Sequence, residues 1–191
     1  MSGALVLTHG LPGSGKSSLA AWLCELFPGR VKIAERDEIR AEILPADYHS
    51  RGHDEASEAR VEIRQHELLR EGLADGSIVV VSDTNLAEIR LRKLIGIARE
   101  LDAPIFHVHF DIPVDEAKRR NEGRAAGGGR LVPDWVIDEM ATYGYANGRL
   151  KVFSVVPSAG SDELEILILE RDGSEPTMGD EIEAIRLAVA P

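Results

Sequence analysis

The chain has 191 residues, of which 43% are hydrophobic, so it is long and apolar enough for one α/β domain and is not a disordered chain. Its net charge of −11 excludes a broad basic surface that coats nucleic acid, although it is compatible with a local basic groove. A single cysteine excludes an internal disulfide and a cysteine-based metal site. The sequence contains no membrane-length apolar run, and its start lacks a signal-peptide pattern, so we expect a cytoplasmic protein without a membrane partner.

The first predicted strand, residues 4–9, leads into a loop with the pattern G-x-x-x-x-G-K-[ST]. Glycines allow a tight turn that points N–H groups at phosphate, and the following helix adds its positive end. Lys16 supplies a cation for the outer phosphates, and the Ser17 hydroxyl is a ligand for Mg²⁺. We therefore expect ATP or another nucleoside triphosphate to bind here with Mg²⁺. The residues predicted to bind it are Gly10, Pro12, Gly13, Ser14, Gly15, Lys16, Ser17 and Ser18.

Strands and helices alternate after this loop, which favours an α/β fold with a parallel sheet covered on both faces. Further strands are predicted at residues 31–34, 78–81 and 104–110. Helices are predicted from the loop to 27 and at 36–44, 53–75, 85–101, 113–121 and 133–147, with Asn85 as a cap and a glycine-rich loop at 123–129. Residues 1–150 are the predicted main domain. Residues 151–191 are predicted to be a C-terminal extension that completes the sheet or is appended to it.

Asp83 follows the apolar strand 78–81, at the strand end where parallel sheets place their ligands. An acid in this position supports Mg²⁺ near the serine of the phosphate loop, and the alternative role is that of a helix cap. Asp37 and Arg40 lie three residues apart and share one helix face. A kinase needs such a carboxylate as a general base and an arginine for an acceptor phosphate, although pairs of this kind are often solvated.

The stretch from Lys118 to Arg130 is basic and rich in glycine, and Arg120 and Arg124 flank a predicted helix end at Gly123. Phosphoryl transfer needs positive charge over the transferred group, which a closing lid supplies while it excludes water. The alternative is a solvated loop with arginines that suit the helix dipole. Of the scattered histidines, His107 and His109 lie two residues apart on one predicted strand. With no third ligand in the pattern, we favour packing or surface roles over metal binding. We expect Trp22 and Trp135 in the core rather than as platforms for base stacking.

These pieces, in this order, resemble the kinase domain of the phage T4-type 5′-hydroxyl polynucleotide kinases. The matching segments are residues 10–17, 28–29 with 36–40, 81–86 with Arg90, 110–113, 120–124 and 132–133, within residues 4 to 145. The phosphatase domain of the larger family members is not matched, since Glu170 stands where their motif has its nucleophilic aspartate. The glycine run of residues 125–130 also departs from the family and makes the lid geometry uncertain.

The resemblance implies a P-loop kinase fold, with a lid at about residues 119–132, that transfers the γ-phosphoryl group of a nucleoside triphosphate to a 5′-hydroxyl end of single-stranded DNA or RNA. It implies donor phosphate and Mg²⁺ binding by Lys16 and Ser17, and a general base in Asp37. It further implies that Arg40 holds the adjacent acceptor phosphate and that Asp83 organises the donor–acceptor junction. Arg120 and Arg124 would be lid arginines on the donor. The rival hypotheses are a small-molecule kinase for a nucleoside, sugar or antibiotic, and a nucleotide-switched binding module. Oligomeric state and the preference for DNA or RNA are undetermined.

Overall fold

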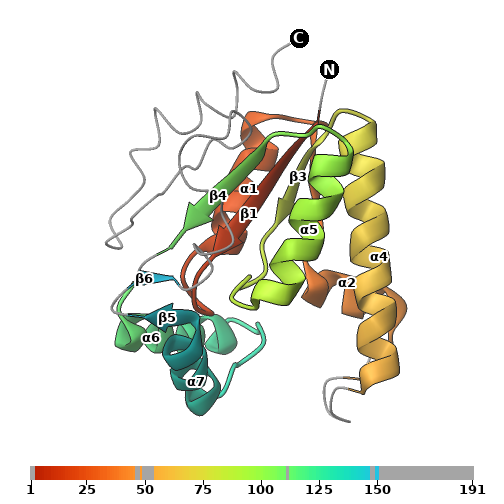
Figure 1. Cartoon of the computed structure of the whole chain (residues 1–191). Helices are drawn as coiled ribbons and strands as arrows, with labels where there is room; N and C mark the ends of the chain where they lie inside the picture. Colours follow the sequence, from red (N-terminus) through yellow and green to blue (C-terminus); the bar gives the residue numbers. More distant parts are fainter. Residues whose placement is uncertain (1–2, 46–47, 49–53, 111, 147–148, 151–191) are drawn as a thin grey trace.

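The computed structural model describes residues 3–45, 48, 54–110, 112–146 and 149–150. Its sheet contains four parallel strands in the order β2-β3-β1-β4 (Figure 1). Their bounds are β1 (Ala4–His9), β2 (Val31–Ile33), β3 (Ile78–Val81) and β4 (Ile105–His109). The predicted α/β fold with a parallel sheet is confirmed. Because β1 lies between β3 and β4, the loops that follow β1 and β3 leave the same edge of the sheet side by side.

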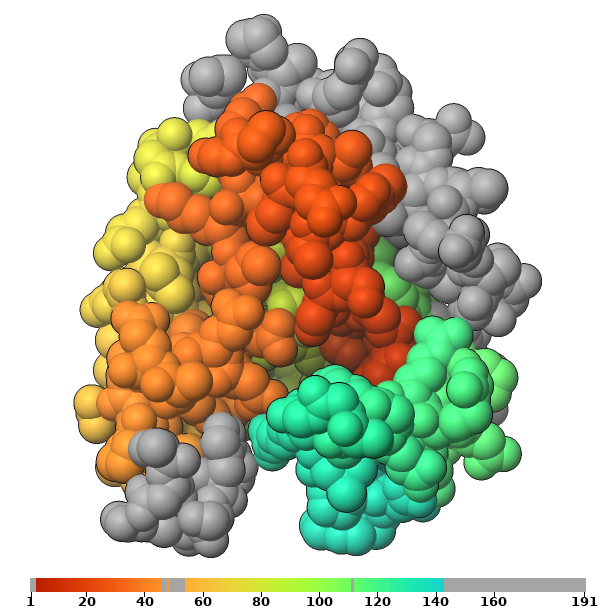
Figure 2. All heavy atoms as spheres, turned by 180° about the vertical axis from the view of Figure 1, so that it is seen from behind, coloured from red at the N-terminus to blue at the C-terminus, as the bar shows by residue number. Residues whose placement is uncertain are grey.

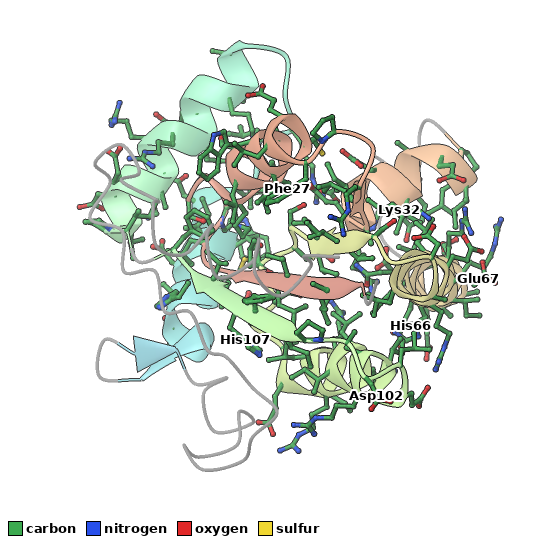
Figure 3. All side chains as sticks on the ribbon, turned by 90° about the horizontal axis from the view of Figure 1, so that it is seen from above. Phe27, Lys32, His66, Glu67, Asp102 and His107 are labelled. Carbon is green, nitrogen blue, oxygen red and sulfur yellow. The ribbon has the colours of Figure 1, made fainter. Side chains whose placement is uncertain are left out.

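Six helices of eight residues or more are described. They are α1 (Lys16–Leu26), α2 (Arg36–Ile43), α4 (Glu55–Ala74), α5 (Glu88–Glu100), α6 (Val114–Ala126) and α7 (Asp134–Gly144). A short antiparallel pair, β5 (Tyr145–Ala146) and β6 (Arg149–Leu150), follows α7. Seen from above, α1 lies on one side of the sheet and α4 and α5 lie on the other (Figure 3). The molecule therefore has three layers, as the alternating order of strands and helices predicts.

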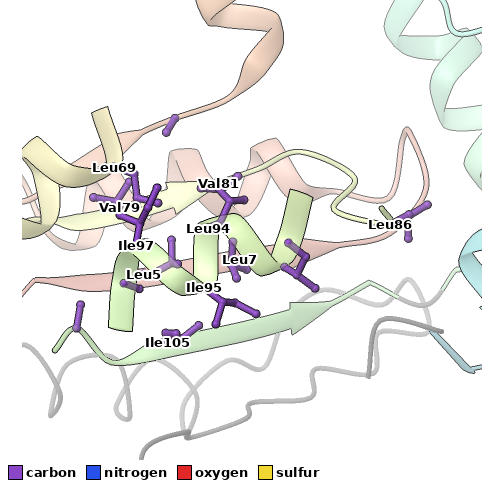
Figure 4. Packing of buried hydrophobic residues seen from close by; sticks show 14 of the residues in the cluster. Leu5, Leu7, Leu69, Val79, Val81, Leu86, Leu94, Ile95, Ile97 and Ile105 are labelled. Atoms are coloured by element: carbon purple, nitrogen blue, oxygen red, sulfur yellow. The ribbon is translucent and has the colours of Figure 1, made fainter. Parts of the chain in front are cut away.

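The strands are apolar on both faces because each face is buried under helices. On β1, Leu5 and Leu7 pack with α4 and α5, whereas Ala4 and Val6 pack with α1. Figure 4 shows Leu5 and Leu7 in the larger of these clusters, beside residues of β3 and α5 such as Val81 and Leu94. This double burial fixes the sheet, and with it the strand ends from which the functional loops emerge.

Three expectations for individual segments are wrong. Asn85 does not cap a helix: it has a φ of 48°, and its amide donates to the backbone oxygens of Thr8, Val81 and Asp83, while α5 begins at Glu88. The helix after Pro113 does not end at residue 121 but continues to Ala126, so the predicted glycine-rich loop is helical over its first residues. Trp135, expected in the core, is 68% exposed on α7.

The predicted C-terminal extension of residues 151–191, with the position of Glu170, lies outside the described residues. Within the described part of the chain, none of the helices has the length and apolar character needed to cross a membrane.

Candidate active site

The glycine-rich loop joins β1 to α1 and closes against α6. Gly13 and Gly15 have φ values of 81° and 105°, a left-handed region that favours glycine. A Cβ atom on Gly13 would lie 2.6 Å from the backbone oxygen of Ala117 in α6, so the loop and this helix touch at a point where no other residue fits. The loop conformation is thus set by its own glycines and by a close approach from α6.

The Lys16 ammonium is held inside the loop. Its Nζ donates to the backbone oxygens of Gly10 at 3.1 Å and Leu11 at 2.7 Å, and to Ser14 Oγ at 3.2 Å. Burial lowers the pKa of Lys16 to about 8, opposed by the negative charges of Glu35 and Asp83. A buried cation in need of counter-charge suits a site that receives phosphate.

The Ser17 hydroxyl lies against a carboxylate that our sequence analysis did not select. Ser17 Oγ donates to Glu35 Oε2 at 3.4 Å, and Ser82 Oγ donates to the same oxygen at 2.6 Å. Glu35 comes directly after β2 and precedes α2, so it occupies a strand end like that of Asp83. The strand-end rule that selected Asp83 would also have found Glu35, had it been applied to β2.

Asp83 lies at the centre of the strand ends and joins three elements. Its Oδ1 accepts from the backbone N–H of Arg36 at 3.0 Å, and its Oδ2 accepts from Gln65 Nε2 on α4 at 2.7 Å. Burial raises the pKa of the Asp83 carboxyl, and these two hydrogen bonds oppose that shift. The carboxylate therefore anchors the start of α2 and, with it, the helix that carries Asp37 and Arg40.

Asp37 and Arg40 face the same space from one side of α2, as their spacing predicts. Asp37 Oδ1 accepts from Arg40 Nη1 at 2.6 Å and from Arg130 Nη1 at 3.0 Å. The Asp37 side chain is 46% exposed, so it is accessible to a substrate in the cavity. Arg130 comes from the segment between α6 and α7, so this contact joins that segment to α2 across the cavity.

Glu58, on α4, holds the arginines of α2 from behind. It accepts from Arg36 Nη2 at 2.6 Å, from Arg40 Nε and Nη2 at 2.8 Å each, and from the Tyr48 hydroxyl at 3.1 Å. These contacts and Asp37 raise the pKa of Arg40 against the effect of burial. Glu58 was not predicted as a site residue, because it lies on a polar helix rich in acidic residues, where no local pattern distinguishes it.

The two arginines predicted to belong to a lid, Arg120 and Arg124, come from the second half of α6. Arg120 Nε donates to Glu116 Oε1 at 2.6 Å, and Arg124 donates to Asn121 Oδ1 at 3.1 Å and to the Arg130 backbone oxygen at 2.8 Å. Asn121 is fully buried, and its side-chain amide makes two hydrogen bonds with the backbone of Val132. Nδ2 of Asn121 donates to the Val132 oxygen, and Oδ1 accepts from the Val132 N–H. The 121–132 segment is therefore a hydrogen-bonded return. Arg120 lies beside the glycine-rich loop, where a Cβ atom on Gly13 would be 3.3 Å from the Cβ of Arg120. The charge of Arg124 helps to lower the pKa of Lys16.

One cavity of about 600 Å³ unites these groups. Figure 2 shows the surface hollowed between α2, the glycine-rich loop with α1, and the α6–α7 segment. Of the predicted site residues, the following line it: Pro12, Gly13, Gly15, Lys16, Ser17, Ser18, Asp37, Arg40, Asp83, Arg120 and Arg124. Gly10 and Ser14 lie behind the loop and hold Lys16 instead.

The cavity is basic although the chain is acidic. Lys16 and six arginines line it, against three carboxylates: the arginines are Arg36, Arg40, Arg90, Arg120, Arg124 and Arg130, and the carboxylates are Glu35, Asp37 and Asp83. Part of this charge is balanced, because Glu58 pairs with Arg36 and Arg40, and Glu116 pairs with Arg120. Arg90 and Arg124 line the cavity without a carboxylate partner among the described residues. The local basic groove that the sequence left possible is thus present, and it suits a polyanionic ligand.

Among the histidines that the structure describes, none lines this cavity. His9 on β1 stacks on His107 on β4, with ring centroids 5.1 Å apart, and His9 Nε2 lies 2.9 Å from His107 Nδ1 (Figure 3 labels His107). Burial lowers the pKa of His9 to about 3 and that of His107 to about 4, so both rings are neutral. Over the residues that the structure describes, no group of three or more histidine, cysteine or acidic side chains is arranged to hold a metal ion. The packing role expected for these histidines is consistent with their burial.

The glycine-rich loop between a central parallel strand and a helix, with its lysine and serine in place, defines a nucleotide-binding protein with the P-loop kinase fold. Residues 5–144 match the model of the AAA domain family, and the chain belongs to this family.

Known proteins similar to this chain include kinases. The L-seryl-tRNA(Sec) kinase of Methanococcus maripaludis is 28% identical over 139 residues, which is 71% of this chain and 50% of that protein. A chain of the Pnkp1/Rnl/Hen1 RNA repair complex matches with a TM-score of 0.64 and 23% identity, over 74% of this chain and 44% of its own length. The APS kinase CysC of Mycobacterium tuberculosis, in complex with AMPPNP and APS, has a TM-score of 0.56 and 18% identity, over 100% and 99% of the two chains.

The two structural matches show the shared fold. The chain spans half the length of the curated relative and 44% of the matched chain in the repair complex. Together, the family and the site support kinase-type phosphoryl transfer from a nucleoside triphosphate. The specific T4-type family is not established by these comparisons, so the acceptor is a matter for proposal.

Proposed function

We propose that this protein transfers the γ-phosphoryl group of ATP or another nucleoside triphosphate to the 5′-hydroxyl end of single-stranded DNA or RNA. The observation that carries the proposal is the shared cavity: the Asp37 carboxylate and the phosphate-binding Lys16 and Ser17 line the same space, with basic side chains around it. A half-exposed carboxylate across from a triphosphate site is what an attacking hydroxyl needs as a general base.

The chain's own groups suit each part of this reaction. Lys16 would leave its loop carbonyls for the donor phosphates, whose charge replaces those contacts. Asp37 Oδ2 would take the proton of the attacking 5′-hydroxyl, since Oδ1 is the oxygen that both arginines contact. Arg120 and Arg124 would bring positive charge to the transferred group from the lid.

Arg40 retains capacity for an acceptor phosphate. A guanidinium has five N–H donors, and the hydrogen bonds of Arg40 to Asp37 and Glu58 use three of them. The remaining donors on Nη1 and Nη2, on a side chain that lines the cavity, can contact the phosphate next to the reacting hydroxyl. Glu58 keeps the guanidinium in position while this contact forms.

The donor set around Ser17 fits Mg²⁺, because the hydroxyls of Ser17 and Ser82 and the Glu35 carboxylate supply the oxygen ligands that this hard cation prefers. When bound, the ion would supply positive charge that offsets the negative charge developing on the donor phosphates during transfer. Asp83, predicted as a further metal-supporting acid, lines the same cavity, and its two oxygens are engaged by Arg36 and Gln65.

A labelled-ATP assay tests the proposal with a panel of acceptors: a 5′-hydroxyl oligodeoxynucleotide, a 5′-hydroxyl oligoribonucleotide, the same oligomers with a 5′-phosphate, and free nucleosides. We expect transfer to the 5′-hydroxyl oligomers and none to the 5′-phosphorylated controls. Transfer to nucleosides or to no oligomer would refute the proposed acceptor while leaving nucleotide binding intact.

A second acceptor is favoured by one observation, the match to a kinase named for seryl-tRNA(Sec). Its name points to a serine hydroxyl carried on tRNA, which a basic cavity with a general base would also accommodate. Seryl-tRNA therefore belongs in the same panel. Label that is released with serine on mild alkaline deacylation would identify this alternative, whereas label at the 5′ end would survive that treatment.

A further inference from the structure

The carboxylate of Glu35 is the acidic group that the structure places on the P-loop serine. Its Oε2 lies 3.4 Å from Ser17 Oγ, and its charge acts on Lys16, whose pKa it raises. Ligands at 2.0–2.1 Å on adjacent octahedral positions of Mg²⁺ are about 2.9 Å apart. The observed separation of 3.4 Å is longer than that value, so Ser17 and Glu35 can share one ion after a small approach of the two side chains.

Glu35 is also held in place and has an oxygen to spare. The buried Ser82 hydroxyl donates to Oε2 at 2.6 Å and fixes the carboxylate at the end of β3. Among the residues that the structure describes, none donates a hydrogen bond to Oε1. Asp83 differs, because each of its oxygens already accepts a hydrogen bond from the protein.

We propose that Glu35, positioned by Ser82, is the protein carboxylate that binds the Mg²⁺ accompanying the nucleotide, directly or through a metal-bound water. The inference rests on triphosphate binding at the P-loop, as in the proposed function, but is independent of the acceptor. It has an electrostatic consequence. Without the ion, Glu35 repels the triphosphate, and with the ion it attracts the metal complex, so this residue makes nucleotide binding depend on Mg²⁺.

The test measures the dissociation constant of AMPPNP by titration calorimetry, once with excess Mg²⁺ and once with EDTA. The quantity of interest is the ratio of the two constants, which reports the coupling between metal and nucleotide. We expect Glu35→Gln to reduce the Mg²⁺-dependent gain in affinity about tenfold, as loss of a metal-supporting group does. In EDTA, the variant should bind AMPPNP as tightly as the wild type or more tightly, because a repelling charge is gone.

Glu38→Gln is the matched control, since it makes the same chemical change three residues further along the chain, at an exposed position in the first turn of α2 outside the cavity lining. Its ratio should stay within about twofold of wild type. A Glu35→Gln ratio equal to that of the wild type would overturn the proposal. Lost nucleotide affinity in both conditions would do so as well, because it would indicate a role in loop structure rather than in metal binding.

Ser82→Ala gives a second route to the same answer and leaves the carboxylate in the chain. Without the hydroxyl that fixes Oε2, the Mg²⁺-dependent gain should fall in the same direction but by less than in Glu35→Gln. An unchanged ratio in this variant would refute the positioning role of Ser82. All of these measurements need only nucleotide and metal. Failure of the acceptor assay alongside the expected ratios would therefore count against the proposed function and not against this inference.

Discussion

Replacement of Asp37 by asparagine separates chemistry from structure at this site. Asparagine has almost the same shape, but it does not accept the proton of an attacking hydroxyl. The substitution also removes a negative charge from Arg40 and Arg130, which both contact Asp37 Oδ1. The question is whether the lost ion pairs or the lost base dominates.

We expect the loss of the proposed base to dominate. Arg40 keeps its two hydrogen bonds to Glu58, so its guanidinium is not left unpaired. The pair between Asp37 and Arg130 is 46% and 43% exposed, and such pairs contribute about 0–1 kcal/mol. Loss of a general base slows a reaction by about 10²–10⁴-fold, which corresponds to about 3–5 kcal/mol of barrier. The kinetic effect should exceed the change in unfolding free energy severalfold.

The assay compares kcat for a 5′-hydroxyl oligonucleotide with the affinity for Mg²⁺–AMPPNP and with the free energy of unfolding in urea. We expect Asp37→Asn to lower kcat by at least about 10²-fold, to leave nucleotide affinity within threefold, and to change stability by about 1 kcal/mol or less. Asp134→Asn, at an exposed first-turn acid of α7 outside the cavity lining, is the control and should retain wild-type kcat. A fully active Asp37→Asn enzyme would refute the assignment of the base.

Three further predictions concern charge. Lys16→Met should abolish nucleotide binding yet stabilise the nucleotide-free protein by up to about 3 kcal/mol at pH 7. The pKa of Lys16 is about 8 in the folded state and 10.5 in the unfolded state, and each pKa unit corresponds to about 1.4 kcal/mol, so the buried ammonium is costly. The stability difference between Lys16→Met and the wild type should shrink as the pH rises from 8 to 10.5. In this range only the unfolded wild type keeps the Lys16 proton, so the free energy of unfolding of the wild type rises with pH. Urea titrations that show a pH-independent difference would contradict this prediction. Glu58→Gln should lower the unfolding free energy by about 3 kcal/mol, because Arg36 and Arg40 lose their shared charged partner. It should also raise KM for the oligonucleotide more than KM for ATP, and equal changes in both KM values would contradict a role of Glu58 in positioning Arg40. Arg130→Ala should change the unfolding free energy by no more than about 1 kcal/mol. The slope of log KM for the oligonucleotide against log salt concentration, measured between about 50 and 200 mM salt, should fall by about 0.7. An unchanged slope would exclude a contact between Arg130 and a phosphate of the oligonucleotide.

Several site features were predictable from the sequence because they depend on residues close together in the chain. The spacing from Asp37 to Arg40 placed both side chains on one face of α2, and the observed contact between them is 2.6 Å. The strand-end position of Asp83 predicted that it would lie near the phosphate loop, and both line one cavity. The partners of Asp83 were not predictable, since Gln65 approaches from the middle of a helix whose polar residues follow no distinctive pattern.

The sequence alone determined the phosphate loop and the parallel α/β architecture. A turn rich in closely spaced glycines is a local property of the sequence, and so is a strand that is apolar on both faces. Neither depends on where the rest of the chain folds. Only the tertiary structure decided which charges meet. Glu35 reaches Ser17 because β2 and β1 end at the same edge of one sheet, and Arg130 reaches Asp37 across 93 positions of sequence because Asn121 folds the lid segment back. These contacts between distant residues depend on strand order and helix packing, which arise from burial summed over the whole domain. A short sequence pattern therefore does not predict them.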